Sequence, residues 1–100
     1  MDEPSFTEID HDDFRRLLND IANCHMPFGL FGKEHYPPAG VPIYDLPLEY
    51  LVWFKQRSFP KGQLGELMSM VCEIKSHGMD SLFDPMRRLR GGRTKLKNRK

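Results

Sequence analysis

Residues 46–54 read LPLEYLVWF, and this stretch decides the fold because Glu49 is its one charged residue. Pro47 is acceptable in the first turn of a helix, where its missing N–H would have no partner, and Asp45 can cap that turn. The pattern therefore predicts a helix over 46–56. A helix that is apolar on nearly every side must lie at the centre of the core or cover a partner.

Two further helices are predicted, one on each side of this stretch. Apolar residues recur at the spacing of one helix face over 11–23, where acidic residues in the first turn suit the helix dipole. The same period recurs over 61–77, and Gly78 follows as a C-terminal stop. Residues 80–83 are expected to form one short turn that ends before Pro85, because a residue that precedes proline disfavours helical conformation.

The segment between the first two predicted helices, residues 26–45, contains too many glycines and prolines for a long helix. Short extended pieces at 26–31 and 41–44 are expected to pair as a small hairpin, with Pro37 and Pro38 in an exposed connecting loop. The predicted fold is therefore α+β and rich in helix, with about three helices and a short β-hairpin between the first and the second. The alternative is an all-α fold with an irregular segment over 26–45.

The composition is that of one small globular domain, with 100 residues of which 39% are hydrophobic and 29% are charged. Two cysteines exclude a disulfide framework, and no apolar run is long enough to span a membrane. The acidic N-terminus lacks the apolar core of a secretory signal. We therefore expect a cytoplasmic protein that does not contact a membrane.

The net charge of +1 hides an uneven distribution along the chain. Residues 86–100 carry eight basic residues and no acidic one, a charge of +8, whereas residues 1–85 sum to −7. Charge blocks of this kind are usually solvated and often mark interaction tails. The sequence predicts a single globular domain over 1–85, with residues 1–9 held loosely, followed by a basic, flexible C-terminal tail over 86–100.

The basic tail is the strongest functional signal, although a solubilising terminus would have the same composition. Arginine and lysine at this density bind phosphate backbones through the release of counterions, so we expect the tail to contact DNA or RNA. The residues assigned to phosphate contact are Arg87, Arg88, Arg90, Arg93, Lys95, Lys97, Arg99 and Lys100, with Lys33 and Lys61 as contributions from the domain.

Several motifs, taken together, resemble those of a known bacterial family of unknown function. They are Met-Pro-Phe-Gly at 26–29, IYDLPLEYLVWF at 43–54, FPKGQLG at 59–65 and EIK at 73–75. The family is described as "putative quorum-sensing-regulated virulence factor", and a related pattern closes the C-terminus of some exodeoxyribonuclease X-like nucleases. The family's name describes expression, so the resemblance implies no reaction.

The resemblance assigns a structural or partner-contact role to the motif residues Pro27, Phe28, Gly29, Asp45, Pro47, Tyr50, Trp53 and Phe54. Phe28 is expected to anchor its turn in the core, where Gly29 permits a positive φ. The aromatic residues of 46–54 either stack between helices as core or form a patch, with Phe59 and Tyr36, for a partner or for base stacking. The compact form of the family has a basic hairpin tip directly after Phe-Gly. In this sequence Leu30 and Phe31 follow Gly29 instead, and Lys33 is the one basic residue that remains there.

No catalytic motif is present, since the sequence lacks a nucleophile elbow, a His-Glu-x-x-His pair and a P-loop. The side chains that could bind a soft metal ion are Cys24, His25, His35, Cys72 and His77. They lack the close, paired spacing of the ligands in a zinc site. We therefore expect no enzyme activity, no metal and no cofactor.

The predicted function is a small binding module that contacts nucleic acid through its tail. The alternative is a protein–protein adaptor or regulatory accessory that uses the apolar helix and the Met-Pro-Phe-Gly turn, and the oligomeric state is left open.

Overall fold

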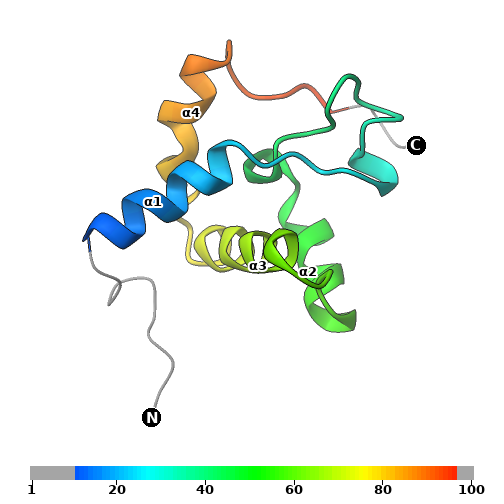
Figure 1. Cartoon of the computed structure of the whole chain (residues 1–100), viewed down its shortest axis with the longest axis horizontal. Helices are drawn as coiled ribbons and strands as arrows, with labels where there is room; N and C mark the ends of the chain where they lie inside the picture. The colour runs from blue at the N-terminus through cyan, green and yellow to red at the C-terminus, as the bar shows by residue number, and fades with distance from the viewer. Residues whose placement is uncertain (1–10, 97–100) are drawn as a thin grey trace.

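The computed structural model describes residues 11–96, and its elements are helical throughout that range (Figure 1). The α-helices are α1 (His11–Ala22), α2 (Leu48–Arg57), α3 (Gln63–Ser76) and α4 (Asp84–Leu89). Three short 3₁₀ turns connect them, namely η2 (Gly29–Phe31), η3 (Ile43–Asp45) and η4 (Asp80–Phe83). The three predicted helices are thus present, each with bounds within two residues of those expected from the periodicity.

Helix α3 lies at the centre of the fold and contacts α1, α2 and η3 (Figure 1). Its buried residues recur along most of its length, and they are Gly65, Leu67, Met68, Val71, Cys72 and Ile74. Helix α2 is less deeply placed, because it buries Leu51 completely but leaves Leu48 and Trp53 exposed. Helix α2 therefore lies at the edge of the core and not at its centre, and whether its exposed face covers a partner stays a prediction.

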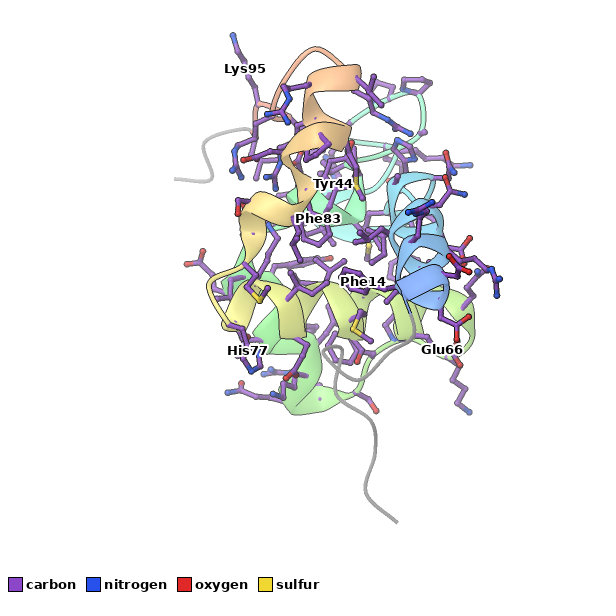
Figure 2. The ribbon with its side chains drawn as sticks, turned by 90° about the vertical axis from the view of Figure 1, so that its left-hand side faces the viewer. Phe14, Tyr44, Glu66, His77, Phe83 and Lys95 are labelled. Carbon is purple, nitrogen blue, oxygen red and sulfur yellow. The ribbon has the colours of Figure 1, made fainter. Side chains whose placement is uncertain are left out.

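The core is closed by side chains from two 3₁₀ turns that lie far apart in the sequence, η3 and η4. The rings of Tyr44 in η3 and Phe83 in η4 stack with their centroids 6.0 Å apart, and both side chains are buried. Figure 2 shows these two rings between α4 and α3. The C-terminal end of the described chain is therefore packed onto the segment that precedes α2.

The prediction of an α+β fold is wrong, because residues 11–96 contain an isolated antiparallel bridge between His25 and Pro42 and no β-strand. The chain does run antiparallel here, since the Met26 N–H donates to the Val41 carbonyl at 2.8 Å. Pro42 has no N–H to extend the ladder, and the chain turns into η2 at Gly29. The alternative of an all-α fold with an irregular 26–45 segment is confirmed.

Two expectations at the helix ends are also wrong. Asp45 does not cap α2, because Pro47 occupies the N-cap position without a side-chain hydrogen bond. The turn over 80–83 is present, but Pro85 does not stop the helix. It lies in the first turn of α4, where a missing N–H has no intrahelical partner to lose. The domain boundary predicted near residue 86 falls inside α4.

Within residues 11–96, no helix combines the length and the apolar character that crossing a membrane requires.

Candidate functional site

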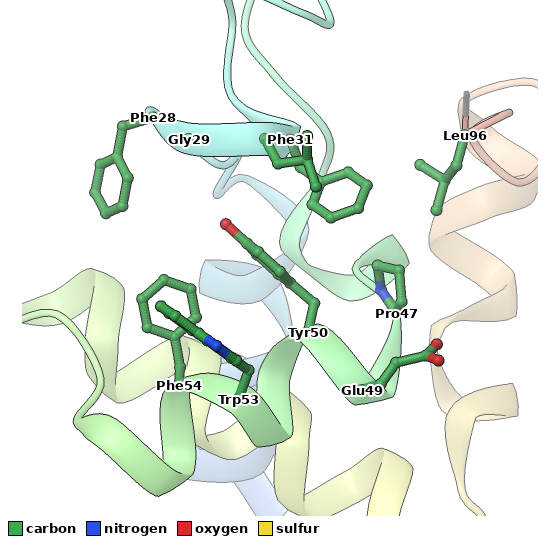
Figure 3. A pocket seen from close by; sticks show the side chains of 10 residues that line it. Phe28, Gly29, Phe31, Pro47, Glu49, Tyr50, Trp53, Phe54 and Leu96 are labelled. Atoms are coloured by element: carbon green, nitrogen blue, oxygen red, sulfur yellow. The ribbon is translucent and has the colours of Figure 1, made fainter. Parts of the chain in front are cut away.

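A cleft of about 770 Å³ opens between the loop that contains η2 and one face of α2 (Figure 3). Three parts of the chain line it: the Met-Pro-Phe-Gly turn with η2, helix α2, and the C-terminal segment. The lining residues are Phe28, Gly29, Leu30, Phe31, Pro47, Glu49, Tyr50, Trp53, Phe54 and Leu96. Six of the eight motif residues singled out from the sequence therefore meet at one surface.

Tyr50 joins the two walls of this aromatic cleft. Its hydroxyl points from α2 toward the turn, between Phe28 and Phe31 (Figure 3). Its ring packs edge-to-face on Phe31, with centroids 4.7 Å apart, and on Phe54, with centroids 5.2 Å apart. Gly29 has a φ of 78°, and a Cβ there would lie 3.2 Å from the Tyr50 hydroxyl, so glycine suits both the backbone and the contact.

Two aromatic rings of the cleft remain open to solvent. Phe28 and Trp53 are each 46% exposed, whereas Tyr50 and Phe54 are partly buried against the core. The expectation that Phe28 anchors the turn in the core is wrong, because Phe31, which is 2% exposed, takes that position. The aromatic helix therefore places Tyr50 and Phe54 against the core and leaves Trp53 on the surface, and a binding role for this surface stays a prediction.

Trp53 is held in place from two sides. Its ring packs edge-to-face on Phe54 at 5.1 Å, and the guanidinium of Arg57 lies 4.3 Å from its ring centroid. A cation over an indole face is attractive and orients the ring. The cleft therefore presents a preorganised, partly exposed indole with a positive charge beside it.

The C-terminal segment reaches the cleft after α4. The Thr94 N–H donates to Oδ2 of Asp45 at 2.9 Å, and Arg93 donates to Oδ2 of Asp80 at 3.1 Å. Leu96 then lines the cleft at the end opposite Phe28 (Figure 3). The C-terminal segment is therefore part of the candidate site.

Arg87 lies at the centre of a buried ion cluster that fixes this segment. Its side chain is 5% exposed, and Nε donates to Oδ1 of Asp45 at 2.6 Å. The two Nη atoms donate to Asp80 and Asp84 at 2.9 Å and to the Tyr44 carbonyl at 3.0 Å. Every acceptor belongs to η3, η4 or α4, so Arg87 ties these elements together.

Asp80 receives three cations, from Arg87, from Arg93 and from Lys75, whose Nζ lies 3.0 Å from Oδ1 of Asp80. Burial alone would raise the pKa of Asp80. The hydrogen bonds from Arg87, Lys75 and Arg93 outweigh it and hold that pKa well below its usual range. The pKa of Lys75 is lowered, because burial of its ammonium exceeds the effect of Asp80. Asp80 is therefore ionised at neutral pH.

The structure separates the residues predicted to contact phosphate into three groups. Arg87 is buried and paired, Arg93 pairs with Asp80, and Arg90 donates to the Ala22 carbonyl at 2.7 Å and lies 3.0 Å from Nε2 of His25. Four cations are exposed on the surface, namely Lys33, Lys61, Arg88 and Lys95. The remaining three lie outside the described residues, and they are Lys97, Arg99 and Lys100. Arg87 is thus unavailable for a phosphate, and phosphate contact by the others stays a prediction.

Two motif residues lie outside the cleft. Pro27 is exposed and borders a smaller hollow beside Cys24 and His25, while Asp45 belongs to the ion cluster. Burial raises the pKa of the Cys24 thiol, and Cys72 is buried in the core. No group of three histidine, cysteine, aspartate or glutamate side chains in the described range is arranged to hold a metal ion.

Sequence reasoning missed the role of Leu96 in the site. Leu96 stands between Lys95 and Lys97, and its 36% exposure is lower than that expected for a leucine in a solvated basic tail. A large apolar residue between two lysines, well after Leu89, was the available signal. Leu30 and Phe31 stand where the compact family form has its basic hairpin tip. Both residues line the cleft on the side that faces α2.

The sequence of this chain matches one protein family and two relatives. Residues 14–86 match the family described as "Putative quorum-sensing-regulated virulence factor". Two similar relatives, from Escherichia coli strain K12 and Escherichia coli O157:H7, both carry the name "Uncharacterized protein YpeB". Each is 43% identical over 75 residues, which cover 74% of this chain and 94% of the relative. No solved structure matches the chain.

Proposed function

Because this chain belongs to the family of "Putative quorum-sensing-regulated virulence factor" proteins, we propose that the aromatic cleft built from its motif residues is a ligand-binding site. The ligand that we propose is single-stranded nucleic acid. In this proposal the protein is a binding module without enzymatic activity. Bases stack in the cleft, and basic residues of the C-terminal segment contact the phosphates.

One observation carries this proposal: the exposed rings of Phe28 and Trp53 line the same cleft as Leu96, which lies within the basic segment. Proteins that bind single strands combine aromatic platforms with positive charge, because every base has a face that can stack. Lys95 is exposed next to Leu96, and the sequence continues with Lys97. Stacking surface and positive charge are therefore adjacent in this chain.

Trp53 is the only tryptophan in the sequence, so its fluorescence reports directly on the cleft. We expect a single-stranded oligothymidylate of about 12 nucleotides, a length typical of such sites, to quench this fluorescence. Fluorescence anisotropy of a labelled strand measures the affinity of the variants Phe28→Ala and Trp53→Ala. Each variant should bind about 5- to 150-fold more weakly, because each loses the stacking of one base on one aromatic ring.

Leu89→Ala is the matched control, because Leu89 is 89% exposed and does not line the cleft. It removes an exposed apolar side chain of similar chemistry and should leave affinity unchanged. Equal losses in this variant and in Trp53→Ala would contradict stacking in the cleft. No binding of the strand by the unaltered protein at low salt would contradict the proposed function as a whole.

The phosphate contacts are tested by the dependence of affinity on salt. Deleting residues 97–100 removes three cations and leaves Arg87 and the described segment intact. Each phosphate contact on a single strand contributes about 0.7 to the slope of log affinity against log salt, so the slope should fall by about 2. An unchanged slope would remove these residues from the interface.

A second function, a protein–protein contact, is favoured by a different observation. Next to the cleft, α2 carries a shallow, mainly apolar hollow lined by Leu48, Val52 and Trp53 with two polar neighbours. We propose a second copy of this chain as the alternative occupant, since exposed apolar surface on a small domain favours self-association. Light scattering should then show a dimer that survives deletion of 97–100 and dissociates in Leu48→Lys. A monomer at every concentration would contradict this alternative.

A further inference from the structure

The path of the chain after α4 depends on two carboxylates that are already engaged elsewhere. Asp45 uses Oδ1 for Arg87, at 2.6 Å, and Oδ2 for the Thr94 N–H, at 2.9 Å. Asp80 uses Oδ1 for Lys75 and Arg87, and its Oδ2 accepts from Arg87 at 3.0 Å and from Arg93 at 3.1 Å. The second oxygen of each carboxylate thus holds the C-terminal segment to the buried cluster.

The segment reverses direction immediately before these contacts. Gly91 and Gly92 have φ values of 86° and 108°, in the region that favours glycine. The Gly92 N–H donates to the Arg87 carbonyl at 2.6 Å, which ends α4. Figure 1 shows the chain then running back across the molecule toward the loop that contains η2. This path brings Leu96 to the cleft.

We propose that residues 90–96 form a strap whose function is to hold its own basic residues, of which Lys95 is exposed next to Leu96, at the rim of the aromatic cleft. Asp45, Asp80 and the Thr94 N–H are then positioning groups, which act through the strap and do not touch the ligand. This inference rests on the proposed function, because it concerns how the stacking surface and the phosphate contacts come to form one site.

The physical basis is preorganisation. A tail that left the domain freely after α4 would search a large volume, and its cations would lose conformational freedom on binding. A strap that ends beside the cleft raises the effective concentration of those cations at a strand already stacked there. Releasing the strap should therefore weaken binding although every residue that contacts the ligand is still present.

The variant Thr94→Pro tests this directly, since proline has no N–H to donate to Asp45. The conservative variant Thr94→Ala keeps the N–H and should behave like the unaltered protein. Docking of the strap can be measured without ligand from the Leu96 methyl resonances, which should be shifted upfield by the aromatic rings of the cleft. We expect these resonances to move to unshifted positions in Thr94→Pro and to stay shifted in Thr94→Ala.

Binding of the oligothymidylate is the second measurement. Thr94→Pro should lower affinity by about tenfold or more, because the cations of the released strap are no longer concentrated beside the bound strand. The slope of log affinity against log salt should stay the same, because no cation has been removed. Recovery of affinity in Thr94→Ala would show that the N–H, not the threonine side chain, is responsible.

The outcomes separate this inference from the proposed function. If the unaltered protein binds the strand and Thr94→Pro releases Leu96 without any loss of affinity, the strap has no positioning role and the inference is overturned. Shifted Leu96 resonances in Thr94→Pro would also overturn it, since the N–H would not be the anchor. If the unaltered protein does not bind the strand, the proposed function fails and the strap proposal fails with it.

Discussion

Arg87 donates hydrogen bonds to η3, η4 and α4 at once, and its charge is shielded from water by the side chains it connects. A single arginine in this position needs several acceptors, because burying a guanidinium is costly unless its donors are satisfied. Three carboxylates and two carbonyls meet that need. Removing the guanidinium would leave Asp45, which is 4% exposed, as an unpaired buried charge.

Arg87→Met should therefore lower the free energy of unfolding by about 3–5 kcal/mol, the usual cost of removing one partner of a buried pair. Arg88→Gln, at the exposed neighbouring position, should change it by less than about 0.5 kcal/mol. Urea denaturation followed by circular dichroism measures both values. Similar stabilities of the two variants would contradict a structural role for the Arg87 cluster.

Sequence reasoning placed Arg87 with the solvated cations for an identifiable reason. A count of charges records that Arg87 stands among other bases, but its partner Asp45 is 42 positions away in the sequence. Only the packing of η3 against α4 brings the two residues together. The position of Asp45 before Pro47 favours a helix cap, whereas its actual partners, Arg87 and Thr94, are 42 and 49 positions away in the sequence.

At the scale of elements, periodicity was sufficient for α1, α2 and α3, because each spans several turns and repeats its apolar face. It was insufficient for η2 and η3, which are single turns whose conformation depends on contacts across the chain. The cleft could be predicted only in part, since the motif residues were identified but their convergence was not. Phe28, Trp53 and Leu96 line one cleft because the fold brings α2, η2 and the C-terminal segment together, although these residues lie far apart in the sequence.

The contact between α3 and the turn before it depends on Gly65. A Cβ at this position would overlap the carbonyl of Pro60, which lies against the helix. Gly65→Ala should therefore destabilise the protein by about 1–3 kcal/mol despite the better helix propensity of alanine, because the crowded atom belongs to the backbone.

Ser69→Ala is the control for this effect, since Ser69 is exposed on the same helix. It should leave the protein unchanged or slightly more stable. Thermal unfolding of both variants gives the comparison. A stabilised Gly65→Ala variant would show that α3 and the turn can separate without cost.

For the molecule as a whole, acidification should destabilise the fold in two steps. Burial and the charge of Arg90 lower the pKa of His25, so stability is lost as the pH falls below about 6.5, its unfolded value. The pKa of Asp80 is lowered more strongly, so a further loss begins below about pH 4. In both ranges the unfolded chain binds more protons than the folded chain, which fixes the sign.

Urea midpoints measured between about pH 7 and pH 3 should follow this course. Asp80→Asn should be less stable at neutral pH and should lose much of the step below about pH 4, while His25→Gln should lose the step at higher pH. Stability that rose on acidification would contradict the ion cluster as a source of folding energy.

The Arg87 cluster also determines how much chain is needed for the domain to exist on its own. The stretch that matches the family description ends at Met86, one residue before the guanidinium that pairs with Asp45 and Asp80. A fragment cut at that point would leave Asp45 without its arginine and Asp80 with Lys75 alone. The unit that can be transplanted between proteins or inherited as a module therefore extends beyond the region that similarity delineates, at least to the residue whose amide closes the cluster, Thr94.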